Sequence, residues 1–381
     1  MISENKWYIK YTFGLAGLML TIYTMVVAKS VLVPLLFSLF FAILLLPVSG
    51  WLERYKFPRV LSSFGAIFLG IILFSGVLFF FFTQMNDFAQ DADMFVERLQ
   101  EMLASLNQFL SQYFDVQNVI RLDQIVETLF NFVRENTASL TRQLSSAAST
   151  LTTILLVPIF VFLILLLRDI LKNFLLKAFG QGDSGQEKKV KTIILNVKAT
   201  VQNYITGVLI VMGILSVLYS ILLTVIGVDH AIFFGVFAGM MNIIPFVGPL
   251  LGSVLPILYA LITMDSLFYP LMILLGFYVI QLFEGNLITP VIVGSQVSMN
   301  ALITLLLLFV GAQVWGLAGM ILFIPLGAIV KVICDEVDQL NPYGYVMGRT
   351  TEDKSEERSI LAKKLRQLSE KASSEKDKKP E

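Results

Sequence analysis

Residues 231–263 read AIFFGVFAGMMNIIPFVGPLLGSVLPILYALIT, an apolar run with a polar, proline-rich centre. That centre holds Asn242, Pro245, Gly248 and Pro249 within eight residues. Prolines remove backbone donors and clash with the preceding turn, so a continuous helix is unfavourable here. As one helix the run would be about 50 Å long, whereas the hydrocarbon core of a bilayer is about 30 Å thick and each arm of about 14 residues is too short to cross it. The run predicts two half-helices that meet at a tip inside a membrane.

A second interrupted run covers residues 301–330, ALITLLLLFVGAQVWGLAGMILFIPLGAIV, with an expected break near Gly311–Gln313 and Gly316. Irregular backbone at membrane depth is tolerated only where it is buried in protein or lines a wet cavity. Paired interrupted segments therefore point to a binding site. The alternative, in which the prolines of the first run only kink a crossing helix to improve its packing, stays open.

The composition indicates a membrane protein. The chain has 381 residues, of which 56% are hydrophobic and 15% charged, and its mean hydropathy is +0.77, outside the range of soluble domains. We expect an all-α polytopic membrane protein with about eight hydrophobic segments, two of them interrupted re-entrant helical hairpins. The single Cys334 and the single His230, which we interpret as a loop residue, exclude an internal disulfide and a Cys- or His-rich metal site. No triad, nucleophile elbow or phosphate loop is present, so we expect no enzyme activity, cofactor or metal, and no nucleic-acid partner.

The remaining apolar segments predict ordinary spans. The first two, 11–28 and 31–51, are separated only by Lys29 and Ser30 and predict a tight helical hairpin retained in the mature protein. Basic loops follow the second and fourth spans, and the positive-inside rule makes them cytoplasmic, together with both termini. The predicted spans are 11–28, 31–51, 60–82, 149–167, 204–226 and 268–284.

Residues 85–146 are not membrane-like, because their apolar positions recur at spacings of three and four. The two amphipathic helices that this predicts either pack on each other or the bilayer surface, or join subunits. Residues 349–381 form a charged tail. The predicted organisation is a static frame of spans at 1–83, amphipathic extracytoplasmic or interfacial helices at 84–147, the fourth span and a basic cytoplasmic loop at 148–203, a transport unit with both hairpins at 204–334, and a charged cytoplasmic tail at 335–381.

A polar cluster, QLFEGNLITP at 281–290, lies between the two interrupted runs. A carboxylate such as Glu284 near hydrocarbon depth is costly and by default a functional candidate, unless Glu284 lies solvated at a cytoplasmic helix end. Free carbonyls at the first break, with the dipoles of half-helix termini, are suited to a polar solute or a cation. The candidate site residues are Asn242, Pro245, Gly248, Pro249, Gln281, Glu284, Asn286, Thr289, Pro290 and Gln313.

Over about residues 10–335 the chain resembles the autoinducer-2 exporter family. The resemblance rests on Pro34, Pro47-Val48 and the basic loop to Arg59, Tyr204-Ile-Thr-Gly207, Asn242-Ile-Ile-Pro-Phe-Val-Gly-Pro249, Glu284-Gly-Asn-Leu-Ile-Thr-Pro290, and the glycine-rich end from Gly311 to Pro325. It implies a transporter of the bacterial cytoplasmic (inner) membrane, assembled as a homo-oligomer, a pentamer, whose protomers move substrate by an elevator motion. Ser298-Met-Asn300 departs from the His-Pro-containing version that is frequent in the family.

The leading hypothesis is a secondary transporter that exports a small polar solute such as autoinducer-2, with the two tips facing each other. A sodium/proton antiporter with Glu284 as the exchanging carboxylate is the first alternative, because family members are assigned either substrate. A non-transporting oligomeric scaffold built around residues 85–146 is the second.

Overall fold

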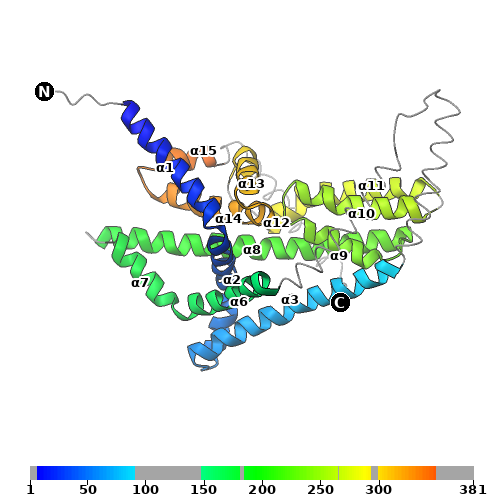
Figure 1. The fold of residues 1–381 in the computed structure, drawn as a ribbon, viewed down its shortest axis with the longest axis horizontal. Coiled ribbons are helices and arrows are strands. Elements are labelled where there is room, and N and C mark those ends of the chain that lie inside the picture. The colour runs from blue at the N-terminus through cyan, green and yellow to red at the C-terminus, as the bar shows by residue number, and fades with distance from the viewer. Residues whose placement is uncertain (1–6, 91–146, 181–183, 265, 293–298, 349–381) are drawn as a thin grey trace, which may run out of the picture. The chain divides into compact units, whose positions relative to one another are not determined.

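The computed structural model describes residues 7–90, 147–180, 184–264, 266–292 and 299–348, and the elements it assigns there are helices (Figure 1). Five of them are long and apolar enough to cross a membrane, and several shorter apolar helices accompany them. This confirms the all-α polytopic membrane class. The elements are α1 (Trp7–Val27), α2 (Lys29–Arg54), α3 (Arg59–Gln90), α6 (Ala147–Leu166), α7 (Arg168–Phe179), α8 (Ser184–Ile226), α9 (Ala231–Met241), α10 (Val247–Thr263), α11 (Phe268–Phe283), η1 (Glu284–Ile288), α12 (Thr289–Ile292), α13 (Ala301–Trp315), α14 (Leu317–Glu336) and α15 (Asn341–Met347).

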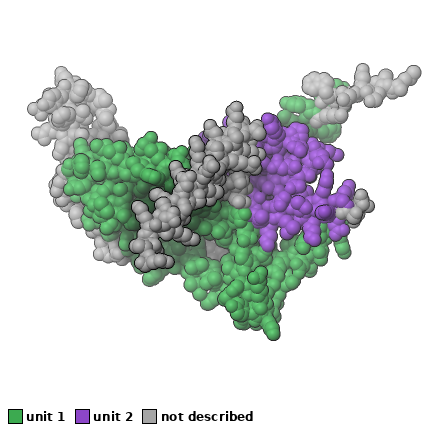
Figure 2. Space-filling view, turned by 180° about the vertical axis from the view of Figure 1, so that it is seen from behind, with its two compact units in different colours: residues 1–177, 202–294 green, residues 178–201, 295–381 purple. Residues whose placement is uncertain are grey.

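The chain divides into two compact units, coloured separately in Figure 2. Unit 1 comprises residues 1–177 and 202–294, and unit 2 comprises residues 178–201 and 295–381. The predicted five-part organisation into frame, amphipathic helices, basic loop, transport unit and tail concerns function, and it stays a prediction. Most of the predicted amphipathic region, 91–146, and the charged tail, 349–381, lie outside the described residues.

The tight hairpin predicted for the first two spans is wrong. Backbone hydrogen bonds continue across Ala28, whose N–H donates to Thr24 O at 2.8 Å and whose carbonyl accepts from Leu32 N at 2.9 Å. The dihedral angles of Ala28, φ −87° and ψ 13°, depart only locally from those of a helix. The residues between the two predicted spans, Lys29 and Ser30, are neither glycine nor proline, so nothing there stops the helix. Helix α1 therefore bends into α2 without reversing direction.

Small side chains hold α2 against its neighbours in unit 1. Ser38 and Ala42 of α2 are buried, and the Ser38 hydroxyl donates both to Pro34 O in its own helix and to Val157 O of α6, at 2.6 and 3.2 Å. Lipid tails are as apolar as leucine, so membrane helices associate through close packing and hydrogen bonds instead of the hydrophobic effect. Ser38 supplies both at one position.

Helices α8 and α9 cross closely because each carries small residues four apart. Gly235 and Gly239 of α9 lie against Ser220 and Ser216 of α8, and a Cβ on either glycine would fall within 2.6 Å of serine backbone atoms. This small-xxx-small pattern is the usual device for close helix crossings in membranes. The large side chains of the unit 1 core, including Tyr219, Phe234 and Phe277, pack on both sides of the crossing.

The first interrupted run is broken at Asn242–Phe246, where its polar centre predicts the break. Helices α9 and α10 then pack antiparallel, since a Cβ on Gly248 would lie 2.8 Å from the Asn242 Cα, and one on Gly252 would lie 2.8 Å from the Ala238 Cα. Gly248 and Pro249 belong to the first turn of α10 rather than to the break, because proline at the start of a helix is tolerated. Re-entry of this pair into a membrane stays a prediction.

The second run, in unit 2, is broken only at Gly316 (φ 63°), between α13 and α14. The expected break at Gly311–Gln313 is wrong, since these residues continue α13. Gly311 serves packing instead: a Cβ there would lie 2.7 Å from the carbonyl carbon of Gly319 in α14, so its absence lets the two helices approach. Here glycine marks a close contact between helices, not the end of one.

Asn300 joins the start of α13 to the end of α15 in unit 2. Its Oδ1 accepts from Ile303 N at 2.9 Å and caps α13, while its Nδ2 donates to the carbonyls of Val346 and Gly348 at 2.8 and 3.2 Å. The short helix α15, which the sequence pattern does not predict, thereby attaches beside the start of α13. The structure describes this corner from Met299 onward, the place where the chain departs from the family motif.

Candidate functional site

A polar network lies in the span that α11, η1 and α12 form together. The Glu284 carboxylate accepts two hydrogen bonds, one from Gln281 Nε2 at 2.8 Å and one from the Thr289 hydroxyl. Gln281 Oε1 in turn accepts from the Tyr219 hydroxyl of α8 at 3.3 Å. Four polar side chains from two helices therefore form one hydrogen-bonded chain that ends on a half-buried carboxylate.

A π-helical turn brings Thr289 to Glu284. In an α-helix the side chains that meet are three or four residues apart, and these two are five apart. Residues Glu284–Ile288 form a π-helix, and the Thr289 N–H donates to the Glu284 carbonyl five residues earlier. The wider turn places the Thr289 hydroxyl on the same face as the Glu284 carboxylate. Single π turns inside helices frequently occur at functional sites.

The local sequence favours this turn. Pro290 has no N–H for the carbonyl one α-helical turn before it, and Gly285 is a poor helix former. The Asn286 side chain donates to Leu282 O at 2.8 Å, a local bond that competes with the regular helical ladder. Asn286 and Pro290, both predicted as site residues, therefore shape the turn in this structure, and the exposed Asn286 makes this bond within its own helix segment.

Tyr219 belongs to this polar network, and the sequence analysis missed it. Its ring stacks on Phe277 with centroids 4.2 Å apart, and its side chain is only 2% exposed. Buried tyrosine hydroxyls usually find a partner, and this one fixes the orientation of the Gln281 amide. A tyrosine with serines on both sides in an otherwise apolar helix, Ser216–Ser220, was the available signal.

The network can bind a cation, a proton or a hydrogen-bond donor. A carboxylate offers about four lone-pair positions, and donors of this chain occupy two on Glu284. The remaining positions suit a bound solute or ion. Among the described residues no group of three or more His, Cys, Asp or Glu side chains could hold a metal.

The break between α9 and α10, Asn242–Phe246, lies beside nearly the same turn of α8 as the polar network does. Gly239 packs against Ser216, and Gln281 bonds to Tyr219, so α9 and α11 contact neighbouring turns of α8. Asn242 and Glu284 each follow three residues later, which is about one helical turn. Asn242 is half-buried, and its amide has no hydrogen-bond partner within the described ranges. Pro245 lies beside it in the break, next to Phe246, whose φ of 66° is strained for a bulky residue.

A family model described as AI-2E family transporter matches residues 15–339, which is most of the chain. The chain belongs to the AI-2E transporter family. It is therefore a multi-pass membrane transporter, and the names of its family and relatives are those of transporters rather than enzymes.

Relatives of this AI-2E family chain cover most of its length. It is 29% identical over 317 residues to "Putative transport protein YrrI" of Bacillus subtilis, a match that covers 81% of this chain and 86% of the relative. It is 28% identical to "Putative transport protein YueF" of the same organism, with 75% and 78% covered. It is 25% identical to "AI-2 transport protein TqsA" of Escherichia coli, with 81% and 87% covered.

Gln313, the last predicted site residue of this AI-2E transporter, lies exposed in the final turns of α13 in unit 2. That it faces the Asn242 tip stays a prediction, because Gln313 and Asn242 belong to different units. The structure thus brings together Gln281, Glu284 and Thr289 of the predicted set and adds Tyr219.

Proposed function

We propose that this chain is a secondary transporter that exports a small polar solute such as autoinducer-2. The observation that carries the proposal is the chain of hydrogen bonds from Tyr219 of α8 through Gln281 to Glu284, the one carboxylate of the span Phe268–Ile292. A membrane protein bears the cost of such groups when they serve a pathway. The solute name comes from the TqsA relative, at 25% identity.

Amides, hydroxyls and a carboxylate suit a small, oxygen-rich solute better than a lipid. Glu284 and Thr289 supply acceptors at the network, and the Asn242 amide supplies a donor and an acceptor at the nearby break between α9 and α10. In this proposal residues 204–334 move as an elevator inside a homo-oligomer, a pentamer in the bacterial inner membrane with its C-terminus cytoplasmic. Alternating access by rigid movement of one part against another is common in transporters with broken helices.

A second candidate function, sodium/proton exchange, is favoured by one observation. Glu284 is the only carboxylate or amine side chain in the span Phe268–Ile292, so a cation that crosses there would have a single carboxylate partner in that span. A carboxylate that alternately binds H⁺ and Na⁺ needs donors that hold it in place, and Gln281 and Thr289 act in that way. The autoinducer-2 and antiporter proposals thus use the same residues.

Flux into proteoliposomes tests both proposals. Wild type, Asn242→Ala and Glu284→Gln are each offered autoinducer-2 and, separately, a sodium/proton pair. Solute export predicts solute flux in wild type that falls about tenfold or more in Glu284→Gln, since a lost bond to a charged group costs about 1.5–3 kcal/mol, and about twofold to tenfold in Asn242→Ala, where the lost bond is neutral. Size-exclusion profiles like those of wild type would show that the variants still assemble.

The other outcomes separate the alternatives. Cation exchange without solute flux, abolished by Glu284→Gln, would support the antiporter and contradict the exporter. Wild-type flux in both variants would remove the network from the proposal. No flux of either kind would favour the scaffold, whose predicted helices fall mostly outside the described residues.

A further inference from the structure

Helix α7 is amphipathic and leaves its apolar side uncovered. Ile170 and Phe174 are 64% and 63% exposed, Phe179 is also exposed, and no residue of the helix is buried. The apolar positions recur at spacings of three to five, whereas Lys172, Asn173 and Lys177 take the other side. At 12 residues, α7 is about 18 Å long and too short to span a membrane.

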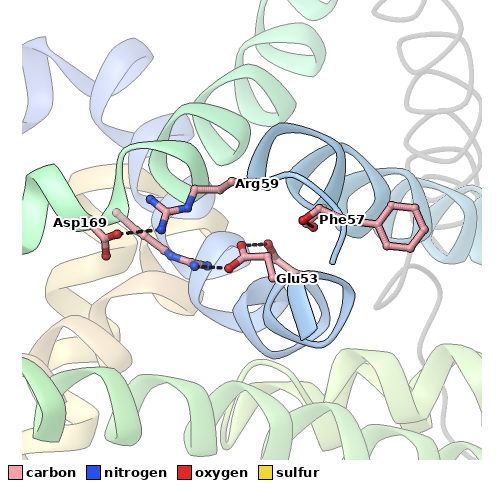
Figure 3. Close-up of polar contacts among 7 residues, drawn as sticks. Glu53, Phe57, Arg59 and Asp169 are labelled. Atoms are coloured by element: carbon pink, nitrogen blue, oxygen red, sulfur yellow. Dashed lines mark hydrogen bonds and ion pairs between the residues drawn. The ribbon is translucent and has the colours of Figure 1, made fainter. Parts of the chain in front are cut away.

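Two ion pairs show how α7 is rotated about its axis (Figure 3). Arg168 at its start pairs with Glu53 at the end of α2, N to O 2.5 Å, and the next residue, Asp169, pairs with Arg59 at the start of α3 at 2.9 Å. The second oxygen of Glu53 accepts from Ser49 at 3.4 Å. Asp169 therefore faces the ends of α2 and α3, and Phe174, five residues on, lies about 140° around the helix from it.

Cations at this corner outnumber the anions that could neutralise them. Both carboxylates, Glu53 and Asp169, are engaged by Arg168 and Arg59. In contrast, Arg54, Lys56, Lys172 and Lys177 have no carboxylate partner among the residues that the structure describes. The corner thus keeps a surplus of positive charge next to an apolar helix face.

Exposed aromatic side chains surround the same corner. Trp51, Tyr55 and Phe57 are all more than half exposed, and Trp51 and Tyr55 meet edge to face with centroids 4.8 Å apart. Tryptophan and tyrosine gather where the hydrocarbon of a membrane meets its headgroups. Their position at the end of the apolar helix α2 places this boundary at residues 51–59.

We propose that α7 and residues 51–59 form an interfacial anchor, which lies along the membrane surface and binds anionic phospholipid headgroups. Ile170 and Phe174 enter the boundary of the acyl chains, as the apolar face of an in-plane helix does. Lys172 and Lys177 contact the headgroups, and Arg54 and Lys56 extend the basic surface. The anchor follows directly from α6, an apolar helix that ends at Leu166, so the chain reaches the surface at the start of α7.

Spin-label accessibility tests the position of the helix. In the full-length chain with Cys334→Ala, which removes the single cysteine, nitroxides are attached at Phe174→Cys and at Asn173→Cys and studied in phosphatidylcholine/phosphatidylglycerol nanodiscs. The label at position 174 should be accessible to oxygen and shielded from a water-soluble nickel chelate, and the label at position 173 should show the reverse. Equal nickel accessibility at both positions would overturn the proposal.

Native mass spectrometry of bound lipid tests the headgroup preference. The ratio of bound phosphatidylglycerol to phosphatidylcholine should fall several-fold in Lys172→Gln/Lys177→Gln, since each lysine near an anionic surface favours binding by about fivefold. The matched control is Lys188→Gln/Lys191→Gln, the same charge change at exposed positions of α8, which should keep the wild-type ratio. An equal fall in both double variants, or none in the first, would contradict the anchor.

Discussion

At the scale of single residues, Thr289 shows how one hydroxyl depends on backbone geometry. Its bond to Glu284 exists because the π turn brings together residues five apart. In a regular α-helix the two side chains would lie on different sides, and Glu284 would have one donor fewer. The sequence places Thr289 in the polar cluster, and the π turn is what brings its hydroxyl to the Glu284 carboxylate.

Thr289→Val should weaken transport while leaving the fold intact. Valine has the shape of threonine without the hydroxyl, and a lost bond to a charged acceptor costs about 1.5–3 kcal/mol, or about tenfold or more in binding. Concentration dependence of flux in proteoliposomes measures the change. The control is Thr224→Val, since the Thr224 hydroxyl bonds only to Ser220 O of its own helix. Equal kinetics in the two variants would exclude a role for the Thr289 hydroxyl.

Asn300→Ala should destabilise the chain measurably. The change removes a helix cap, worth about 0.5–2 kcal/mol, together with the two bonds that attach the end of α15. We expect a lower midpoint of thermal unfolding in detergent, and faster proteolysis after α14. Asn173→Ala, at an exposed helical position, should leave the midpoint within error. A midpoint for Asn300→Ala as high as that of the control would show that the cap contributes little.

At the scale of elements, close helix packing in this protein depends on missing or small side chains. Gly235 and Gly239 let α8 pack closely against one side of α9. On the other side, Gly252 of α10 leaves room for Ala238 of α9. The broken helices α9 and α10 are held in place by these contacts, because lipid offers no hydrophobic drive to assemble them.

Gly239→Ala should push α8 and α9 apart. The new Cβ would lie 2.6 Å from the Ser216 backbone N, and overpacking of this kind costs about 1–3 kcal/mol. The thermal midpoint in detergent should fall, and flux should fall with it because Tyr219 sits on the same face of α8. Gly213→Ala, in α8 with nothing within 4 Å of its new Cβ, should be neutral or slightly stabilising. If both variants unfold at the same temperature, the α8–α9 contact is looser than described.

At the scale of the whole molecule, antiparallel packing of α9 and α10 is the basis for predicting that the first interrupted run re-enters a membrane. A pair that folds back on itself begins and ends on one side, and neither arm need cross. Helix α9, with 11 residues, is about 16 Å long, roughly half the thickness of the hydrocarbon core.

Cysteine accessibility tests this topology. In the Cys334→Ala chain, Asp229→Cys and Ser266→Cys flank α9 and α10, and both should react with an impermeant maleimide from the outside of intact cells. Lys188→Cys, in the basic loop, should react only after the cytoplasmic side is exposed, by the positive-inside rule. Labelling of positions 229 and 266 from opposite sides would replace the re-entrant pair with a full crossing.

Composition and proline spacing by themselves determined the class of this protein and the break at Asn242–Phe246, because long apolar runs satisfy their backbone in lipid as helices and two prolines stop one locally. The same reasoning selected Gln281, Glu284 and Thr289. The prediction of a break at Gly311 was wrong. A glycine in the sequence can either end a helix or allow a neighbouring helix to pack closely, and the sequence alone does not distinguish the two.

Only the tertiary structure decided which helices meet, and with that the role of Tyr219. Its partner Gln281 is 62 residues away in the chain, so no local pattern connects them. The π turn likewise follows from a balance among Gly285, Asn286 and Pro290 that periodicity does not detect. Local chemistry specifies where a membrane helix can break, and packing between distant segments specifies which polar groups then share a site.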